Sequence, residues 1–233
     1  MKKYLLVLLC LLAAKIQAQS LPAQVQLPNG WKISPVGKSF QLGDLPLNIA
    51  VSKTSKYAAV TNNGQSIQSI QLIDINAETV LDQVEIEKSW YGIAFSSDEK
   101  NIYVSGGHDN RILKYEIVNQ KLKRVDSFQL DRPWPVKVGP AGLAIDESSK
   151  LMYVVTREDK MLYVVDLQTK KVVHTYGLDA EAYDCKLSPK TKELLISCWG
   201  CDKVLVFDIE HQIWKQPIVV GDNPNEKIGR AHV

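Results

Sequence analysis

Two apolar runs lie close together in the middle of the chain: Met152-Tyr153-Val154-Val155-Thr156 and Leu162-Tyr163-Val164-Val165-Asp166-Leu167. β-Branched and aromatic residues of this kind suit a pleated, packed sheet better than a helix. The charged residues between the runs favour a turn, so the pattern predicts two antiparallel strands. The second run closes on an acid, which we expect to hydrogen-bond the turn that follows it.

This pair of strands belongs to a unit that occurs four times along the chain. The first strands of the four units begin at Ile49, Ile93, Leu143 and Cys185, a period of about 40 to 50 residues that is typical of propeller blades. The second run of each unit carries one of the acids Asp74, Glu116, Asp166 and Asp208. Fourth β-rich stretches follow at residues 79–86, 122–130, 171–178 and 213–220. The sequence therefore predicts an all-β fold, a β-propeller of four-stranded blades.

The repeats also carry a family resemblance. Strands such as Tyr57-Ala58-Ala59-Val60-Thr61-Asn62 resemble the YVTN class of propeller repeats. The run Leu45-Pro46-Leu47-Asn48-Ile49-Ala50-Val51-Ser52 resembles the YncE-like propeller at the N-terminus of exported bacterial proteins whose second half is an alkaline-phosphatase-superfamily phosphoesterase. That family implies seven blades, whereas residues 31–227 supply about four to four and a half. We therefore expect an incomplete propeller with an open edge prone to association, and a monomer when intact; the alternative is a complete propeller of four blades.

The two ends of the chain depart from the repeat. Lys2 and Lys3 precede an apolar stretch at residues 4–14, and Ile16-Gln17-Ala18 is typical of a cleavage site, so residues 1–18 are predicted to be a signal peptide and residues 19–30 a linker. Cys10 would suit a lipoprotein signal, but Leu9 stands where that signal needs a small residue. Residues 228–233 read as the translation of a common sequencing adapter, and we interpret them as a foreign tail on a truncated chain.

The composition excludes several classes of protein. Hydrophobic residues make up 45% of the chain, which excludes intrinsic disorder. The 28 Lys and Arg residues nearly balance the 26 Asp and Glu residues, so a nucleic-acid binder is not expected. The apolar run near the N-terminus is too short to span a membrane. We expect a soluble protein, exported to the periplasm or the extracellular space.

Propellers bind ligands on the face where loops join the second strand to the third and one blade to the next. In this chain those loops gather amide, aromatic and basic residues, which make good anchors for a ligand. The predicted binding residues on this face are Asn62, Asn63, Trp90, Tyr91, His108, Asn110, Trp134, Arg157, Tyr183 and Trp199. The alternative is that Trp90, Trp134 and Tyr183 only pack between blades.

Motifs with catalytic potential are weak. Cys198-Trp199-Gly200-Cys201 has the C-x-x-C spacing but ends a strand and does not open a helix, so a redox function is not expected. A disulfide among Cys185, Cys198 and Cys201 is plausible after export, with the pairing open. His108 and Asp109 are neighbours, which fits a solvated turn better than a catalytic pair. We predict no catalytic residue, metal site or cofactor.

These observations favour a non-catalytic binding scaffold whose partner is a protein domain or a small ligand. In the intact gene, the resemblance implies a phosphoesterase domain after the propeller. One alternative is a hydrolase in its own right, such as a propeller lactonase with its site at the channel mouth. Another is a structural module that only contacts a partner domain.

Overall fold

The computed structural model describes residues 25–33, 41–188, 190–221 and 224. Contacts divide the chain into two units, Met1–Gln41 and Leu42–Val233. In the first unit, β1 (Val25–Gln26) and β2 (Lys32–Ile33) form an antiparallel pair. The predicted signal peptide and the predicted tail lie outside the described residues. Within the described part of the chain, no helix is long and apolar enough to cross a membrane.

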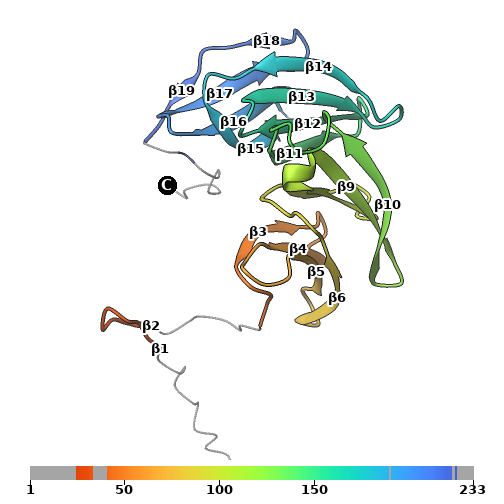
Figure 1. Cartoon of the computed structure of the whole chain (residues 1–233), viewed down its shortest axis with the longest axis vertical. Coiled ribbons are helices and arrows are strands. Elements are labelled where there is room, and N and C mark those ends of the chain that lie inside the picture. Colours follow the sequence, from red (N-terminus) through yellow and green to blue (C-terminus); the bar gives the residue numbers. More distant parts are fainter. Residues whose placement is uncertain (1–24, 34–40, 189, 222–223, 225–233) are drawn as a thin grey trace, which may run out of the picture. The chain divides into compact units, whose positions relative to one another are not determined.

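The second unit contains four antiparallel sheets that follow one another along the chain (Figure 1). Blade 1 consists of β3 (Pro46–Val51), β4 (Tyr57–Asn62), β5 (Ser69–Asp74) and β6 (Thr79–Glu85). Blade 2 consists of β7 (Ile93–Phe95), β8 (Asn101–Ser105), β9 (Arg111–Val118) and β10 (Lys121–Gln129), with a short 3-10 helix, η1 (Gly107–Asp109), between β8 and β9.

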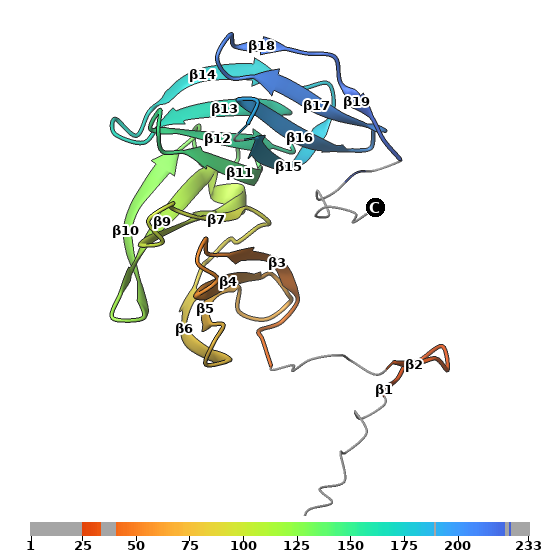
Figure 2. The ribbon, with the colours of Figure 1, turned by 180° about the vertical axis from the view of Figure 1, so that it is seen from behind.

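The other two sheets have the same strand order, and both can be followed from behind in Figure 2. Blade 3 consists of β11 (Pro140–Asp146), β12 (Leu151–Thr156), β13 (Met161–Asp166) and β14 (Val172–Gly177). Blade 4 consists of β15 (Glu181–Ser188), β16 (Glu193–Trp199), β17 (Lys203–Asp208), β18 (Ile213–Trp214) and β19 (Ile218–Val219). The structure confirms the all-β prediction and the propeller of four-stranded blades, of which the described residues form four.

Two local expectations were wrong. The fourth strand of blade 4 is split into β18 and β19, which pair separately with β17. Pro217 lies in the gap, and a proline has no N–H to donate to a sheet. Tyr183 was expected in a loop between blades but lies inside β15, where the pairing register shifts between Ala182 and Asp184. This bulge changes the direction of the strand locally and re-aims the Tyr183 side chain.

The repeated acids hold the turns that follow them. Oδ1 of Asp74 accepts a hydrogen bond of 2.8 Å from the Ala77 N–H, and Oδ1 of Asp166 accepts bonds from the N–H groups of Gln168 and Thr169 at 2.8 and 2.7 Å. Asp208 accepts from the His211 N–H at 3.0 Å. The expected role of these acids is thus confirmed for the three aspartates.

The hydrophobic core lies in the seams, the packed boundaries between consecutive blades. Successive side chains of a strand point to opposite faces of the sheet, so alternate residues of one strand pack in two different seams. In β12, Met152 and Val154 pack in the second seam, against blade 2, whereas Tyr153 and Val155 pack in the third seam, against blade 4. All four side chains are buried, and the burial of each contributes about 2 kcal/mol. Each blade is therefore stabilised mainly by its neighbours.

Blade 4 has a second face that points away from the third seam. On this face Leu195 of β16 pairs with Val206 of β17, and Ser197 pairs with Val204. Leu195, Val204 and the half-exposed Ile218 line an apolar hollow of about 300 Å³. None of the hydrophobic clusters of the described residues joins this face to blade 1.

Candidate functional site

Four of the predicted binding residues form one surface cluster with two residues that were not predicted. The cluster, which we call the Trp134 patch, consists of Trp90, His108, Trp134, Lys137, Arg157 and Glu158. Trp90 lies between β6 and β7, His108 lies in η1, Trp134 and Lys137 precede β11, and the other two follow β12. The patch thus draws on loops of three blades.

Charged groups and indole rings alternate across the Trp134 patch. The Arg157 guanidinium lies over the Trp90 ring, with Cζ 5.0 Å from the ring centroid. Oε1 of Glu158 lies 3.8 Å from Arg157 and 3.7 Å from Nδ1 of His108. The His108 ring meets Trp134 edge to face at 5.7 Å. Lys137 Nζ lies 5.8 Å from the Trp134 ring centroid. Cation–π contacts of this kind are worth about 0.5–1 kcal/mol at exposed sites and fix the orientation of the rings.

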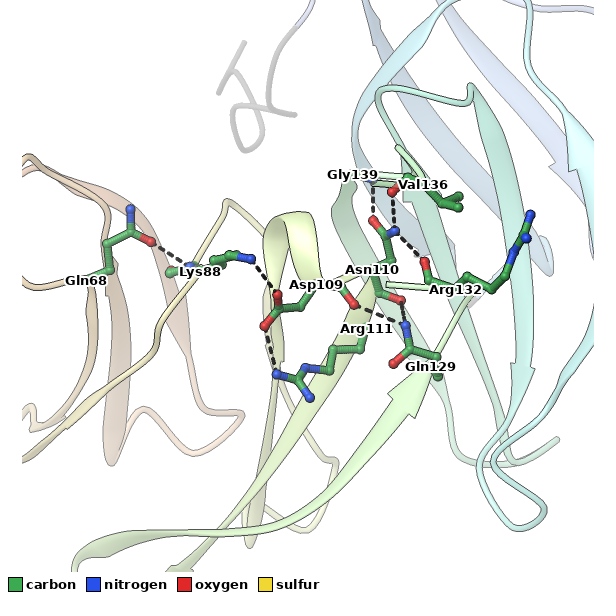
Figure 3. A network of polar contacts seen from close by, with 10 residues as sticks. Gln68, Lys88, Asp109, Asn110, Arg111, Gln129, Arg132, Val136 and Gly139 are labelled. Atoms are coloured by element: carbon green, nitrogen blue, oxygen red, sulfur yellow. Dashed lines mark hydrogen bonds and ion pairs between the residues drawn. The ribbon is translucent and has the colours of Figure 1, made fainter. Parts of the chain in front are cut away.

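Asn110 positions the loop that carries Trp134 and Lys137. Its side chain is fully buried, and Nδ2 donates hydrogen bonds to the carbonyl oxygens of Arg132 and Val136 at 2.8 and 2.6 Å. Oδ1 accepts from the N–H groups of Val138 and Gly139 at 3.3 and 3.4 Å. Figure 3 shows the amide enclosed by this loop. Asn110 was predicted to bind a ligand, but in the structure its amide is used within the fold.

The loop between β6 and β7 is held against η1 by Asp109. Its carboxylate accepts from Lys88 Nζ at 3.0 Å and from Arg111 at 2.8 Å (Figure 3). Burial alone would raise the pKa of Asp109, but these two hydrogen bonds outweigh it and lower the pKa below its usual value. The adjacent His108 side chain contacts Glu158 and Trp134 instead. His108 and Asp109 are adjacent in sequence but therefore contact different residues.

The Trp134 patch is shallow. The hollow at its centre, lined by Trp90, His108, Arg157 and Glu158, measures only about 40 Å³, which is room for a water molecule or two. Trp134 itself is 53% exposed. This shallow geometry suits contact with another surface better than it suits enclosure of a small ligand.

Three other predicted residues form a separate aromatic row. The ring of Tyr91 lies 4.6 Å from that of Tyr183, and Tyr183 meets Trp199 at 6.4 Å. Tyr91 is buried, so its part in this row is packing between blades 2 and 4. Trp199 is 46% exposed at the end of β16. Trp90 of the Trp134 patch and Tyr91 of the aromatic row are adjacent in sequence.

The two predicted asparagines of blade 1 lie in neither group. Asn62 is fully buried, and its Nδ2 donates to Ser69 Oγ at 3.2 Å and to Gln71 Oε1 at 3.0 Å. The N–H of Asn63 donates to the Leu45 carbonyl at 3.0 Å. The Asn62 side chain therefore links β4 to β5, whereas the Asn63 N–H extends the β3–β4 pair.

The three described cysteines are free thiols. Cys185 and Cys198 are buried in the third seam, whereas Cys201 is only partly buried and its thiol lies 3.4 Å from the Cys198 carbonyl oxygen. Burial raises the pKa of Cys198 to about 12 and that of Cys185 well above its usual value. A disulfide among these cysteines stays a prediction.

Alkylation should distinguish these thiols, because the thiolate is the reactive form. At mildly alkaline pH we expect iodoacetamide to label Cys185 and Cys198 in the folded protein at least about a hundredfold more slowly than Cys201. Timed quenching followed by peptide mass spectrometry would measure the three rates. In guanidinium at a denaturing concentration the rates should converge. Labelling of Cys198 as fast as that of Cys201 in the folded protein would contradict this interpretation.

Glu158 and Lys137 are the patch residues that the candidate set missed. Glu158 directly follows Arg157, which was predicted. Its contact with His108 could not be read from the sequence, because the two residues belong to different blades. Among the described residues, no group of three or more His, Cys, Asp or Glu side chains is placed to hold a metal ion.

Comparison with known proteins supports the fold. No family model matches the chain, and no curated protein matches it. Many solved structures match it; one is hydrazine synthase of Kuenenia stuttgartiensis, with a TM-score of 0.63 and 18% sequence identity. The match covers 80% of this chain and 53% of that chain, so the chain spans about half the length of the hydrazine synthase chain. At this identity the similarity shows a shared fold alone.

Proposed function

We propose that this chain is an exported, non-catalytic β-propeller of the YVTN/YncE-like type that binds another protein through the Trp134 patch. The observation that carries the proposal is the half-exposed Trp134, surrounded by His108, Lys137 and the Arg157–Trp90 pair. Tryptophan and arginine are the residue types most enriched among those that dominate protein–protein binding energy. The propeller fold, a common scaffold for binding, agrees with this role.

A protein partner suits the patch better than a small ligand. Small-molecule pockets typically enclose about 300–1,000 Å³, whereas the hollow of the Trp134 patch holds about 40 Å³. The patch also carries both signs of charge, on Glu158 and on Lys137 and Arg157. A protein surface with complementary charges would fix the orientation of the complex.

Two further parts of the proposal rest on the sequence. The basic and apolar start of the chain supports export with cleavage after Ala18. The resemblance to bifunctional proteins supports a phosphoesterase domain in the intact gene product. Such a domain would be a partner within the same protein.

Trp134→Ala tests the proposed function. Cross-linked capture from a periplasmic extract would identify partners of the purified chain, and direct titration of an identified partner would give its affinity. We expect Trp134→Ala to weaken that affinity at least about tenfold, since truncation of a central tryptophan costs about 2 kcal/mol or more. Trp199→Ala, an exposed tryptophan outside the patch, is the matched control and should leave the affinity unchanged.

Two outcomes would count against the proposal. If no captured protein binds in a way that depends on Trp134, the Trp134 patch is not the interface. If the purified chain hydrolyses aryl phosphates or lactones and the turnover falls in His108→Ala, the chain is an enzyme and the alternative function holds.

A further inference from the structure

Acidic side chains fasten the first two seams at one end. Glu99, in the turn between β7 and β8, accepts hydrogen bonds from the N–H and the hydroxyl of Thr54, in the turn between β3 and β4. The hydroxyl bond measures 2.7 Å. Glu147, between β11 and β12, accepts from the N–H and the hydroxyl of Ser97 in the same way, with an N–O distance of 2.6 Å. We call each of these bidentate contacts a clip.

The third seam has no such clip among the described residues. In the turn between β15 and β16, Thr191 stands immediately before a lysine, as Glu99 does in blade 2. Its hydroxyl donates to Ser188 of its own turn at 2.7 Å. Across the seam, the Asp146 carboxylate is occupied by Ser148 and Ser149 of its own turn. The described residues of each turn therefore hydrogen-bond within that turn, and no hydrogen bond between described residues joins the two turns.

A cavity of about 720 Å³ opens at this place, between blades 3 and 4. Its apolar lining includes Tyr153 and Val164 from blade 3 and Leu187 and Phe207 from blade 4. One wall is closed by a hydrogen bond of 2.9 Å from the Tyr176 hydroxyl to Gln212 Oε1. The Tyr176 and Phe207 rings lie 4.7 Å apart in the same wall. The volume falls within the range of small-molecule sites in proteins, about 300–1,000 Å³.

The polar groups of the cavity favour an uncharged ligand. Asp146 is hydrogen-bonded within its turn, and Lys192 faces Glu210 at 3.7 Å. Both charges of that pair are mostly exposed to solvent. The hydroxyls of Ser149 and Ser188 also line the cavity and can exchange hydrogen bonds with a neutral polar group.

We propose that this cavity, the seam cavity, binds a small uncharged molecule with a flat aromatic or fused-ring body and one polar end. The partly exposed Tyr176 ring would stack against the ring system, with the buried Tyr153 and Phe207 side chains behind it, and the serine hydroxyls would receive the polar end. The site is separate from the Trp134 patch, which is built by other loops of the propeller. The missing clip is what leaves room for the ligand.

The probe for a test is N-phenyl-1-naphthylamine, a neutral fused-ring amine whose fluorescence rises in apolar surroundings. We expect saturable binding of one probe per chain. Leu187→Trp fills the cavity from blade 4 and should weaken binding at least about tenfold. Thr191→Glu places an acid at the turn position that Glu99 has in blade 2 and should weaken binding by closing the seam. Because Thr191 is exposed, this variant also covers the case in which Leu187→Trp does not fold.

The apolar hollow on the other face of blade 4 supplies the matched control. Val204→Trp fills that hollow and should leave probe binding unchanged. The proposal is overturned if the unmodified chain shows no saturable binding, or if Leu187→Trp and Thr191→Glu bind as the unmodified chain does. If only Val204→Trp loses binding, the probe binds in the hollow on the other face of blade 4, and the proposal is overturned.

Discussion

Asn110→Asp is expected to lower the free energy of unfolding by about 3 kcal/mol. The substitution keeps the shape of the side chain but replaces the Nδ2 donor with an oxygen. The carbonyl oxygens of Arg132 and Val136 then lose their hydrogen bonds and face a second acceptor. Each buried group left without a partner costs about 1–3 kcal/mol. Urea unfolding at neutral pH, followed by circular dichroism, would measure the change.

Asn119→Asp is the matched control for this substitution. Asn119 also has a left-handed backbone, with φ of 50° against 54° for Asn110, but it is exposed in the turn between β9 and β10. Asp tolerates this region about as well as Asn, so the backbone does not confound the comparison. We expect a change within about 0.5 kcal/mol for the control. A loss below about 1 kcal/mol in Asn110→Asp would mean that the loop is held by other contacts.

Gly142→Ala should destabilise the protein by about 3 kcal/mol, because a Cβ at this position meets backbone atoms that cannot rotate away. The added atom would lie 2.5 Å from Cα of Asp184 and 2.8 Å from the Cys185 nitrogen. Both belong to β15, the first strand of the next blade. Relief would require the first strands of blades 3 and 4 to separate, and the third seam would loosen with them.

Gly177→Ala controls for the general effect of replacing glycine in a strand. No atom lies within 4 Å of a Cβ built at Gly177, at the end of β14. Its unfolding midpoint should stay close to that of the unmodified protein, and the two variants can be compared in one thermal or urea series. If Gly142→Ala unfolds at the same midpoint as Gly177→Ala, the close approach of β11 to β15 does not limit stability.

Local patterns in the sequence were enough to predict the blades. Strands such as β12 and β13 alternate residues for two seams, and Asp166 supplies acceptors for its own turn, so both features depend on residues near in sequence. The split of β18 from β19 could also have been expected, because Pro217 stands in the sequence. The bulge at Tyr183 could not, since it depends on how β15 pairs with β16.

The candidate site was predicted less well, because the position of a residue in a loop does not reveal whether its side chain is buried. Loop position placed Trp90, His108, Trp134 and Arg157 on one face, and the structure brings these four side chains together. It could not separate Trp134, which is half exposed, from Asn110, whose amide is consumed by backbone groups. The seam cavity was not foreseen at all. The turn residues alone do not show it, because the two acids that form clips, Glu99 and Glu147, stand at different positions of their turns.

The order in which the blades are fastened matters for synthesis on the ribosome. Every seam joins blades that are consecutive in sequence, so each new sheet can dock on the one made just before it. The ring contact between Tyr91 and Tyr183 skips a blade and must form later. The clipped seams come first along the chain and the unclipped one last. Vectorial folding would thus give a nascent chain three secured sheets before the fourth emerges.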